Sequence, residues 1–320
     1  MPKINNNSTY FVQKAIRILE FSLFAVLLSL FPSPNFYFRP QIPVQISHAT
    51  DPQISLPPPP PLPVNGNLSP LPILSAQGVV VKDLESGVIL YAKNEQKLLF
   101  PASTTKVMTA LIILEKYNLD DVFTVNSVIT DGRKMDLMAG EKLTVEALLQ
   151  GTLIHSANDA AYVLADNYPG GVSAFVKAMN DKARQIGLRD TYFTNPVGFD
   201  DPHHYTTPLD LVRLAVYALN NKTFNKIVST KAITVSDITF TYFHELTNVN
   251  QLLGRVAGIA GVKTGYTENA GEILISTVKK NGHNILFAVL KSHDRFGETV
   301  KLIDWVFYNF KWVEVAEVEI

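Results

Sequence analysis

Proline is distributed very unevenly along this chain of 320 residues, and no other feature restricts its folding as strongly. Fourteen of the 19 prolines lie between Pro2 and Pro72, and five are spread over the remaining 248 residues. Proline fixes its backbone φ angle and lacks an N–H, so a proline-rich stretch disfavours helix and sheet. The sequence therefore divides into a head with little expected regular structure and a 248-residue body, which is long enough to bury one large core.

The head has the pattern of a targeting segment. Lys3, Lys14 and Arg17 precede an apolar run of 11 residues, Phe21–Phe31, and basic residues in front of such a run keep that end in the cytoplasm. The run fits the core of a signal peptide better than a full membrane span of about 20 residues. The nearest small-residue cleavage site, Ser47–Ala49, begins well beyond the run, which favours an uncleaved anchor over a cleaved signal. In both cases we expect the body to be exported.

We expect three parts: a membrane anchor or signal segment over residues 1–38, a proline-rich linker over 39–73, and a folded domain over 74–320. The consecutive prolines Pro57–Pro61 favour an extended polyproline II spacer. The absence of cysteine excludes disulfides, thiolate metal sites and a cysteine nucleophile. With 28 basic and 29 acidic residues, the chain offers no basic footprint, so we expect no nucleic-acid partner.

The body has strand patterns at both ends and helix patterns between them. Helical periodicity is found over 105–117, 144–154, 159–167, 172–186, 208–219 and 294–310. Short apolar or alternating runs predict strands over 77–83, 88–93, 261–267, 272–280 and 284–292. Asn281-Gly282 predicts a hairpin turn. We expect an α/β fold of the α+β type, in which one five-stranded, mainly antiparallel sheet is flanked by helices and interrupted by a helical insert.

Ser103-Thr104-Thr105-Lys106 lies where a helix pattern begins, directly after Pro101. Residues i and i+3 share a helix face, so Ser103 and Lys106 are expected to form a hydrogen bond. A serine hydroxyl needs a nearby base to become a good nucleophile, and a neutral lysine amine can be that base. A free lysine has a pKa of about 10.4, so burial or nearby positive charge must lower its pKa to about 7. Free N–H groups at a helix start also suit an oxyanion.

The same spacing recurs at Ser276-Thr277-Val278-Lys279, so the motif alone carries little weight. That segment is predicted to be a strand, where residues i and i+3 point to opposite faces, and we expect this second pair to be inert. Taken alone, Ser103 fits a helix N-cap better than a nucleophile.

Two further motifs carry groups suited to a peptide substrate. Ser156-Ala157-Asn158 lies between two helix patterns; its hydroxyl can relay a proton and its amide can bind a substrate amide. Lys263-Thr264-Gly265 lies on the first strand after the insert, where a cation beside a hydroxyl suits a carboxylate and glycine permits close approach to the strand. The ordinary alternatives are a helix N-cap at Ser156 and a surface lysine at Lys263. Ser33-Pro34-Asn35 in the head repeats the second pattern without meaning.

In the order Ser-x-x-Lys, Ser-x-Asn, Lys-Thr-Gly, the motifs resemble those of the penicillin-binding protein and β-lactamase superfamily. Their flanking sequence is similar to the low-molecular-mass penicillin-binding proteins that are serine-type D-alanyl-D-alanine carboxypeptidases, the S11 peptidase family. The similar segments are Phe100–Lys106, Met138–Glu141, Ser156–Ala160, Asn195–Gly198, His204–Thr207 and Gly261–Gly271. The resemblance covers roughly residues 76–312 and implies a β-lactamase/DD-peptidase-like fold, with 74–320 as the catalytic domain.

The resemblance implies a penicillin-sensitive hydrolase of cell-wall biosynthesis and cell shape. It would remove the terminal D-alanine from peptidoglycan stem peptides through an acyl-enzyme on Ser103. Lys106 would be the general base, and Ser156 would relay a proton to the leaving D-alanine. The implied substrate-binding residues are Asn158, Lys263, Thr264, Gly265 and Tyr266, the last through a backbone N–H that forms the oxyanion hole with that of Ser103.

The expected inhibitors are β-lactams, and we expect no cofactor and no metal. The N-terminal segment is the expected contact with the membrane, which would hold the body at the outer face of the cytoplasmic membrane. Longer family members continue into a β-rich domain and an amphipathic helix, whereas this sequence ends at Ile320, so we expect any tether at the N-terminus.

Several alternatives share parts of this pattern. A DD-endopeptidase would cut peptidoglycan cross-links with the same residues. A class A β-lactamase needs a glutamate after the second motif, and none lies between Ala147 and His244. A zinc peptidase is disfavoured because His244-Glu245 lacks the second histidine of the zincin pattern, and we expect the histidines in surface or loop positions. A catalytically inactive penicillin-binding module is also compatible with the motifs.

Overall fold

The computed structural model describes residues 7–29, 58–67 and 69–314, and the chain divides into two units, Met1–Pro57 and Pro58–Ile320. In the first unit, helix α1 covers Asn7–Ser29. Within the described ranges, no helix combines the length and the apolar character needed to cross a membrane. Most of the predicted linker, from residue 39 to 57, lies outside the described residues.

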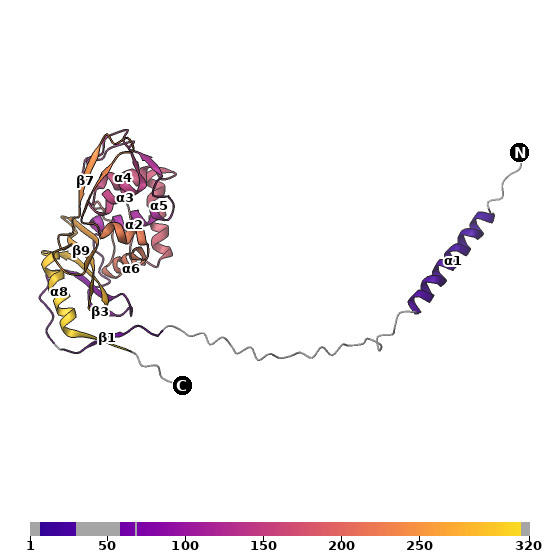
Figure 1. Cartoon of the computed structure of the whole chain (residues 1–320), viewed down its shortest axis with the longest axis horizontal. Helices are drawn as coiled ribbons and strands as arrows, with labels where there is room; N and C mark the ends of the chain where they lie inside the picture. The colour runs from indigo at the N-terminus through magenta and orange to yellow at the C-terminus, as the bar shows by residue number, and fades with distance from the viewer. Residues whose placement is uncertain (1–6, 30–57, 68, 315–320) are drawn as a thin grey trace. The chain divides into compact units, whose positions relative to one another are not determined.

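The second unit is built on a five-stranded sheet with the strand order β3-β2-β10-β9-β8, of which Figure 1 labels β3 and β9. The strands are β2 (Gly78–Asp83), β3 (Ile89–Lys93), β8 (Ile259–Thr267), β9 (Gly271–Lys280) and β10 (His283–Ser292). All four pairings are antiparallel, and β2 from the start of the unit lies beside β10 from near its end. The sheet predicted from the two ends of the body is therefore confirmed, and β8 forms one of its edges.

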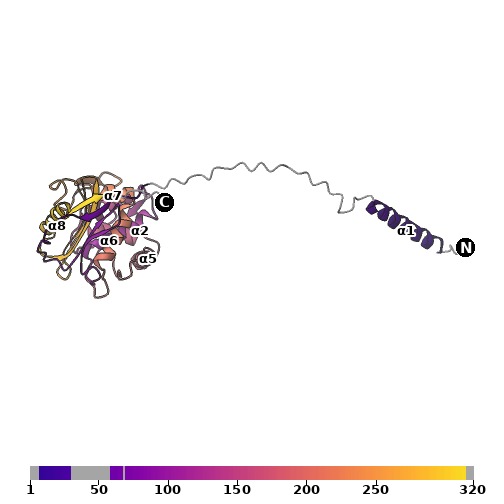
Figure 2. The same ribbon diagram turned by 90° about the horizontal axis from the view of Figure 1, so that it is seen from below.

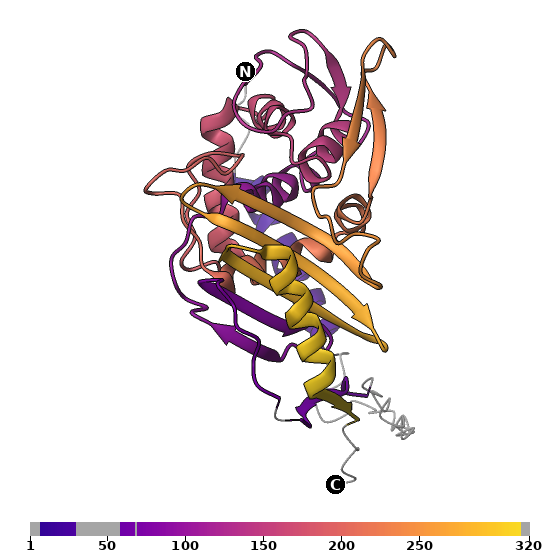
Figure 3. The ribbon, with the colours of Figure 1, turned by 90° about the vertical axis from the view of Figure 1, so that its left-hand side faces the viewer.

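Helices cover both faces of this sheet. Helix α8 (Arg295–Asn309) lies across one face, and the other helices of the second unit lie on the opposite face (Figures 2 and 3). Because side chains alternate along a strand, Val79 and Val81 pack with Val306 of α8, whereas Val80 belongs to the larger core on the opposite face. Two cores therefore hold the sheet, and the larger one contains the helical insert.

The insert runs from the 3-10 helix η2 to helix α7. Its helices are η2 (Ala102–Thr105), α2 (Lys106–Leu114), α3 (Val145–Leu153), α4 (Asn158–Asp166), α5 (Gly171–Gln185), α6 (Pro208–Leu219) and α7 (Lys222–Val228). Buried residues extend without interruption from Lys106 to Ile113, so α2 is buried on all sides and forms the centre of the insert. Thr207 caps α6 by accepting from the Asp210 N–H, and Pro208 occupies the first helical position.

Three two-stranded ribbons were not predicted. They pair β1 (Leu62–Asn65) with β11 (Phe310–Val313), β4 (Val122–Thr124) with β5 (Lys142–Thr144), and β6 (Ala232–Ser236) with β7 (Phe243–Thr247). Strands of three to five residues are too short for a two-residue period to stand out from the helical pattern around them. Strand β1 lies within residues 39–73, the segment predicted as a linker, and Pro58 onward belongs to the second unit. Pro63 is tolerated in this strand because the ribbon has a free edge.

Candidate active site

The nucleophile motif lies at the start of the buried helix α2. Ser103 is in η2 and Lys106 is the first residue of α2, so the two side chains lie on the same face. The distance between Lys106 Nζ and Ser103 Oγ is 3.0 Å. The hydrogen bond predicted from their spacing is therefore present.

Lys106 is completely buried, although lysine is almost never so without compensation. Burial penalises the charged amine and lowers the pKa of Lys106 to about 7, while the negative charge of Asp159 acts in the opposite direction. The amine is therefore neutral in a large share of molecules at neutral pH, as a general base must be.

Two acceptors orient the Lys106 amine. Nζ lies 2.6 Å from Asn158 Oδ1 and 2.9 Å from the carbonyl oxygen of Val197. A neutral amine has two N–H donors and one lone pair, and these two oxygens take both donors. The lone pair then points to the third neighbour, Ser103 Oγ–H, which is the geometry for removing its proton.

The second motif contributes a hydroxyl that bonds to a second buried lysine. Ser156 has a φ of 61°, in the left-handed region that non-glycine residues rarely adopt, and its Oγ accepts from Lys263 Nζ at 2.7 Å. Burial holds the pKa of Lys263 well below its usual range, and the positive charges of Lys106, Arg295 and Arg133 lower it further. Ser156 is thus placed beside an amine that can exchange a proton with it.

Asn158, the first residue of α4, is held between Lys106 and the loop that contains Asp131 and Arg133. Its backbone N–H donates to the Arg133 carbonyl at 2.7 Å, and its Nδ2 donates to the Asp131 carbonyl at 3.0 Å. Gly132 is required beside it, because a Cβ there would lie 2.3 Å from Asn158 Nδ2. The second Nδ2 hydrogen remains available to a substrate carbonyl.

The third motif brings the edge strand β8 against η2. Gly265 allows this contact, since a Cβ there would lie 3.1 Å from Ala102 Cβ and 3.4 Å from the Ser103 nitrogen. The glycine was expected to admit a ligand backbone. The segment that approaches it is the chain's own turn at Pro101–Ser103, which we call the nucleophile turn. Gly198 has a similar role on the other side, where a Cβ would lie 1.8 Å from the Ala102 carbonyl oxygen.

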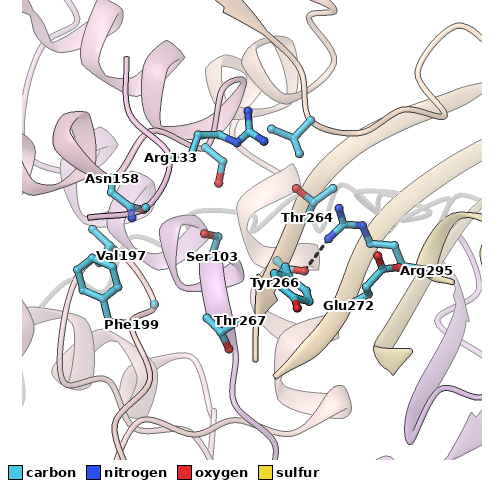
Figure 4. Close-up of a pocket in the computed structure, with 15 residues that line it drawn as sticks. Ser103, Arg133, Asn158, Val197, Phe199, Thr264, Tyr266, Thr267, Glu272 and Arg295 are labelled. Atoms are coloured by element: carbon cyan, nitrogen blue, oxygen red, sulfur yellow. Dashed lines mark hydrogen bonds between the residues drawn. The ribbon is translucent and has the colours of Figure 1, made fainter. Parts of the chain in front are cut away.

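A cavity of about 520 Å³ opens above Ser103. One side is lined by Asn158, Val197 and Phe199 and the other by Thr264, Tyr266 and Arg295 (Figure 4). Arg295 Nη1 donates to the Gly265 carbonyl at 2.8 Å, and its Nε is buried without a hydrogen-bond partner in the described structure. Lys106 and Lys263 lie behind this lining. The cavity therefore offers a serine at its floor and cations along the Thr264 side.

The second Ser-x-x-Lys pair has a different setting. Ser276 is fully buried in β9 and accepts from Asn250 Nδ2 at 3.0 Å, whereas Lys279 is exposed. Neither residue lines the cavity. The strand predicted for 272–280 is confirmed, and the two side chains are not brought together. The Ser33-Pro34-Asn35 repeat lies outside the described residues.

His204 lies in a loop, as expected, but is buried, and His244 is buried in strand β7, which corrects the expectation of a surface or loop position for His244. His204 Nδ1 accepts from the Thr194 N–H, so Nε2 carries the proton and donates to Thr105 Oγ1 at 2.9 Å. Burial lowers the pKa of His204 to about 4, which keeps the ring neutral. His244 lies 2.7 Å from the carboxylate of Glu141. Within the described residues, no group of three histidine, aspartate or glutamate side chains is arranged to hold a metal.

The sequence motifs do not contain the residues that complete the cavity. Arg133, Phe199 and Val249 line it from loops, and no periodicity or spacing indicates them. The buried position of Asp159 was also missed, although it directly follows the second motif. Its carboxylate accepts from the Met135 and Leu137 N–H groups, both at 3.1 Å, and so holds the loop that carries Arg133.

Together, a serine hydrogen-bonded to a buried lysine and an edge strand that carries Lys263 and Thr264 beside the same cavity are the arrangement of serine acyl-transfer enzymes with the penicillin-binding fold. A family model described as D-alanyl-D-alanine carboxypeptidase matches residues 67–294. The chain belongs to this D-alanyl-D-alanine carboxypeptidase family, which confirms the resemblance found in the sequence.

The chain is similar to several characterised proteins. It is 32% identical over 246 residues to the D-alanyl-D-alanine carboxypeptidase DacF of Bacillus subtilis, covering 74% of this chain and 63% of that protein. The crystal structure of the Streptomyces K15 DD-transpeptidase matches with a TM-score of 0.70 and 31% identity, covering 75% of this chain and 100% of that one. Penicillin-binding protein D2 of Listeria monocytogenes, in its ampicillin-bound form, matches with a TM-score of 0.67 and 29% identity, covering 75% and 100%. The expected fold is confirmed by these structures.

Proposed function

We propose that this protein is a serine-type D-alanyl-D-alanine carboxypeptidase that removes the terminal D-alanine from peptidoglycan stem peptides. The observation that carries the proposal is the environment of Lys106, a fully buried amine with a pKa of about 7 whose Nζ lies 3.0 Å from Ser103 Oγ. This arrangement activates a serine without histidine or metal.

In the acylation step, Ser103 Oγ attacks the carbonyl carbon between the two D-alanines while Lys106 Nζ takes the hydroxyl proton. Negative charge develops on the carbonyl oxygen. In this proposal the backbone N–H groups of Ser103 and Tyr266 stabilise it, and the close approach of β8 to residues 101–103 at Gly265 supports this role. One such donor is worth roughly 100- to 1,000-fold in rate in other hydrolases.

The leaving D-alanine needs a proton on its nitrogen and a site for its carboxylate. Ser156 Oγ relays the proton, since it lies 2.7 Å from Lys263 Nζ, an amine whose pKa is lowered by burial and by the charge of Lys106. Thr264, Lys263 and Arg295 bind the carboxylate, because Thr264 and Arg295 line the cavity beside Ser103 and Lys263 Nζ donates to the Thr264 carbonyl. The C–N bond breaks as the nitrogen is protonated, which leaves the peptide esterified to Ser103.

Water completes the cycle by attacking the acyl-enzyme carbon, which releases the shortened peptide and returns a proton to Ser103 Oγ. The cavity lining contains one carboxylate, Glu272, which accepts from the Arg295 backbone N–H. This bond draws Glu272 towards the Arg295 side of the cavity, so a penicilloyl group should hydrolyse slowly. The protein is then inhibited by β-lactams, and rapid turnover of nitrocefin would contradict this part of the proposal.

A matched pair of serine variants tests the proposed reaction. The full chain is incubated with a stem pentapeptide that ends in D-Ala-D-Ala, and released D-alanine is measured for the wild type, Ser103→Ala and Ser276→Ala. We expect release by the wild type, loss of at least about 1,000-fold in Ser103→Ala, and near wild-type release in Ser276→Ala. Equal loss in both variants, or no loss in Ser103→Ala, would contradict the assignment.

We also propose that the N-terminal segment directs export of the enzyme to the outer face of the cytoplasmic membrane, where its substrate lies. The basic residues in front of the apolar run support export, and helix α1 contains that run up to Ser29. N-terminal sequencing of the protein from cell fractions separates the two forms of the proposal. An intact N-terminus in the membrane fraction means a retained tether, a shortened one means a cleaved signal, and protein confined to the cytoplasm contradicts export.

A further inference from the structure

Arg133 is the cavity residue that the proposed reaction leaves without a role. It lines the cavity from the loop over residues 131–138, and Figure 4 shows it above Ser103. Its positive charge lowers the pKa of Lys263, of Arg295 and of His155, the residue next to Ser156. Arg133 therefore lies close to the side of the cavity that takes the leaving amino acid.

The loop that carries Arg133 is fixed at several points. The Arg133 carbonyl accepts from the Asn158 N–H at 2.7 Å, and the buried Asp159 carboxylate holds the N–H groups of Met135 and Leu137. His244 adds a cross-link, because its Nδ1 donates to the Met135 carbonyl at 2.7 Å. A fixed loop presents its side chain with little further loss of conformational freedom on binding.

The next residue, Lys134, is paired with a carboxylate, whereas Arg133 is not. Lys134 Nζ lies 3.3 Å from Asp136, whereas Arg133 has no salt-bridge partner among the described residues. Depth also separates the cations of the cavity: Lys263 is buried, Arg295 is half-buried and Arg133 is exposed at the mouth. The deep pair suffices for the single α-carboxylate of a leaving D-alanine, so the outer guanidinium is left for another anion.

We propose that Arg133 binds a second carboxylate, carried by the leaving amino acid beyond its α-carboxylate. The inference rests on the proposed function, because it uses the same acylation of Ser103 and the same leaving side. It extends the substrate class to peptides in which the bond after D-alanine joins a dicarboxylic residue, as at a cross-link between two stems. A planar guanidinium at the mouth suits such a carboxylate because it can form two parallel hydrogen bonds.

Three stem peptides that differ only in the last residue test this proposal: D-Ala-D-Ala, D-Ala-D-Glu and D-Ala-D-Gln. Glutamine keeps the shape of glutamate and removes its side-chain charge. We expect the wild-type chain to have a kcat/KM for D-Glu about tenfold or more above that for D-Gln, which is the scale of a charge-assisted hydrogen bond. In Arg133→Ala this ratio falls to about one, while Lys134→Ala, which removes the adjacent paired cation, keeps the wild-type ratio.

We expect thermal melting to show that each variant is folded, because both side chains lie on an anchored surface loop. A wild-type ratio near one, or a ratio that is unchanged in Arg133→Ala, contradicts the role of Arg133 while the hydrolysis of D-Ala-D-Ala still supports the proposed function. Failure of the wild type to hydrolyse any of the three peptides contradicts the proposed function, and this inference falls with it.

Discussion

The chain contains the same Ser-x-x-Lys spacing twice, in two settings that differ in secondary structure and in the burial of the lysine. At Ser103 the spacing falls on a helix start, so both side chains share a face and the lysine is buried against three hydrogen-bond partners. At Ser276 it falls on strand β9, where the serine is buried and Lys279 is exposed. The difference teaches that the spacing supplies the two groups, and that the helix and the burial of its lysine turn them into a nucleophile and a base.

The largest expected effect comes from removing the two lysines in turn. Lys106→Ala deletes the general base and should reduce D-alanine release by at least about 1,000-fold, whereas Lys279→Ala should stay within about twofold of the wild type. Release assays on purified full-length variants give both values. Comparable losses in the two variants would contradict the assignment of Lys106 as the general base for Ser103.

The next test displaces the nucleophile turn without touching its side chains. Gly198 has a φ of +93°, and a Cβ there would lie 1.8 Å from the Ala102 carbonyl oxygen, so Gly198→Ala must shift the segment that carries Ser103. We expect D-alanine release to fall by at least about 100-fold, since a displacement of about 1 Å can cost that much.

Gly187→Ala is the matched control for this change. Gly187 also has a positive φ, +76°, but a Cβ there would contact nothing within 4 Å. This variant should lose about 1 kcal/mol of stability from backbone strain and keep its activity. If Gly198→Ala were as active as Gly187→Ala, the close packing of residues 195–198 against the nucleophile turn would not be needed for activity.

A smaller effect is expected from pH. Burial lowers the pKa of Lys106 to about 7, so the amine is protonated below that pH and cannot accept the proton of Ser103. Acylation by a β-lactam should therefore fall about tenfold per pH unit below 7 and level off above it, as measured between pH 5 and 9. A rate that is flat between pH 5 and 7 would show that the base is another group.

Ser276→Ala should change activity least and stability slightly. The variant removes the acceptor for Asn250 Nδ2 inside the core, which should lower the free energy of unfolding by about 1–3 kcal/mol. Chemical denaturation measures the loss, and D-alanine release should remain within about threefold of the wild type. A loss of D-alanine release well beyond threefold in a variant that is still folded would place Ser276 in the reaction.

How far the sequence predicts this molecule depends on how local each interaction is. The Ser103–Lys106 contact follows from one helical turn, and strands β8 to β10 follow from runs of nine or ten residues, so both were predictable. The burial that lowers the pKa of Lys106 depends on Asn158 and Val197, which approach from distant segments of the chain. No local pattern contains that information.

The same reasoning explains what was missed. Arg133 reaches the cavity only because Asp159 and His244 fix its loop, and these contacts join residues more than 20 positions apart. Strands β6 and β7 have five residues each, and the two buried positions of β7 are the polar His244 and the apolar Leu246, so its alternation in burial is not matched by an alternation of apolar residues in the sequence. The sequence motifs therefore located the chemistry, while the surroundings that tune and restrict it required the fold.

The central claim is that the helical Ser-x-x-Lys pair alone is reactive, and peptide mapping of a covalent adduct tests it most directly. The full chain is treated with benzylpenicillin at pH 8, digested, and searched by mass spectrometry for serine residues that carry the penicilloyl group. We predict a single adduct on Ser103, absent from Ser103→Ala and retained in Ser276→Ala. An adduct on Ser276, or none on Ser103 under these conditions, would contradict the account.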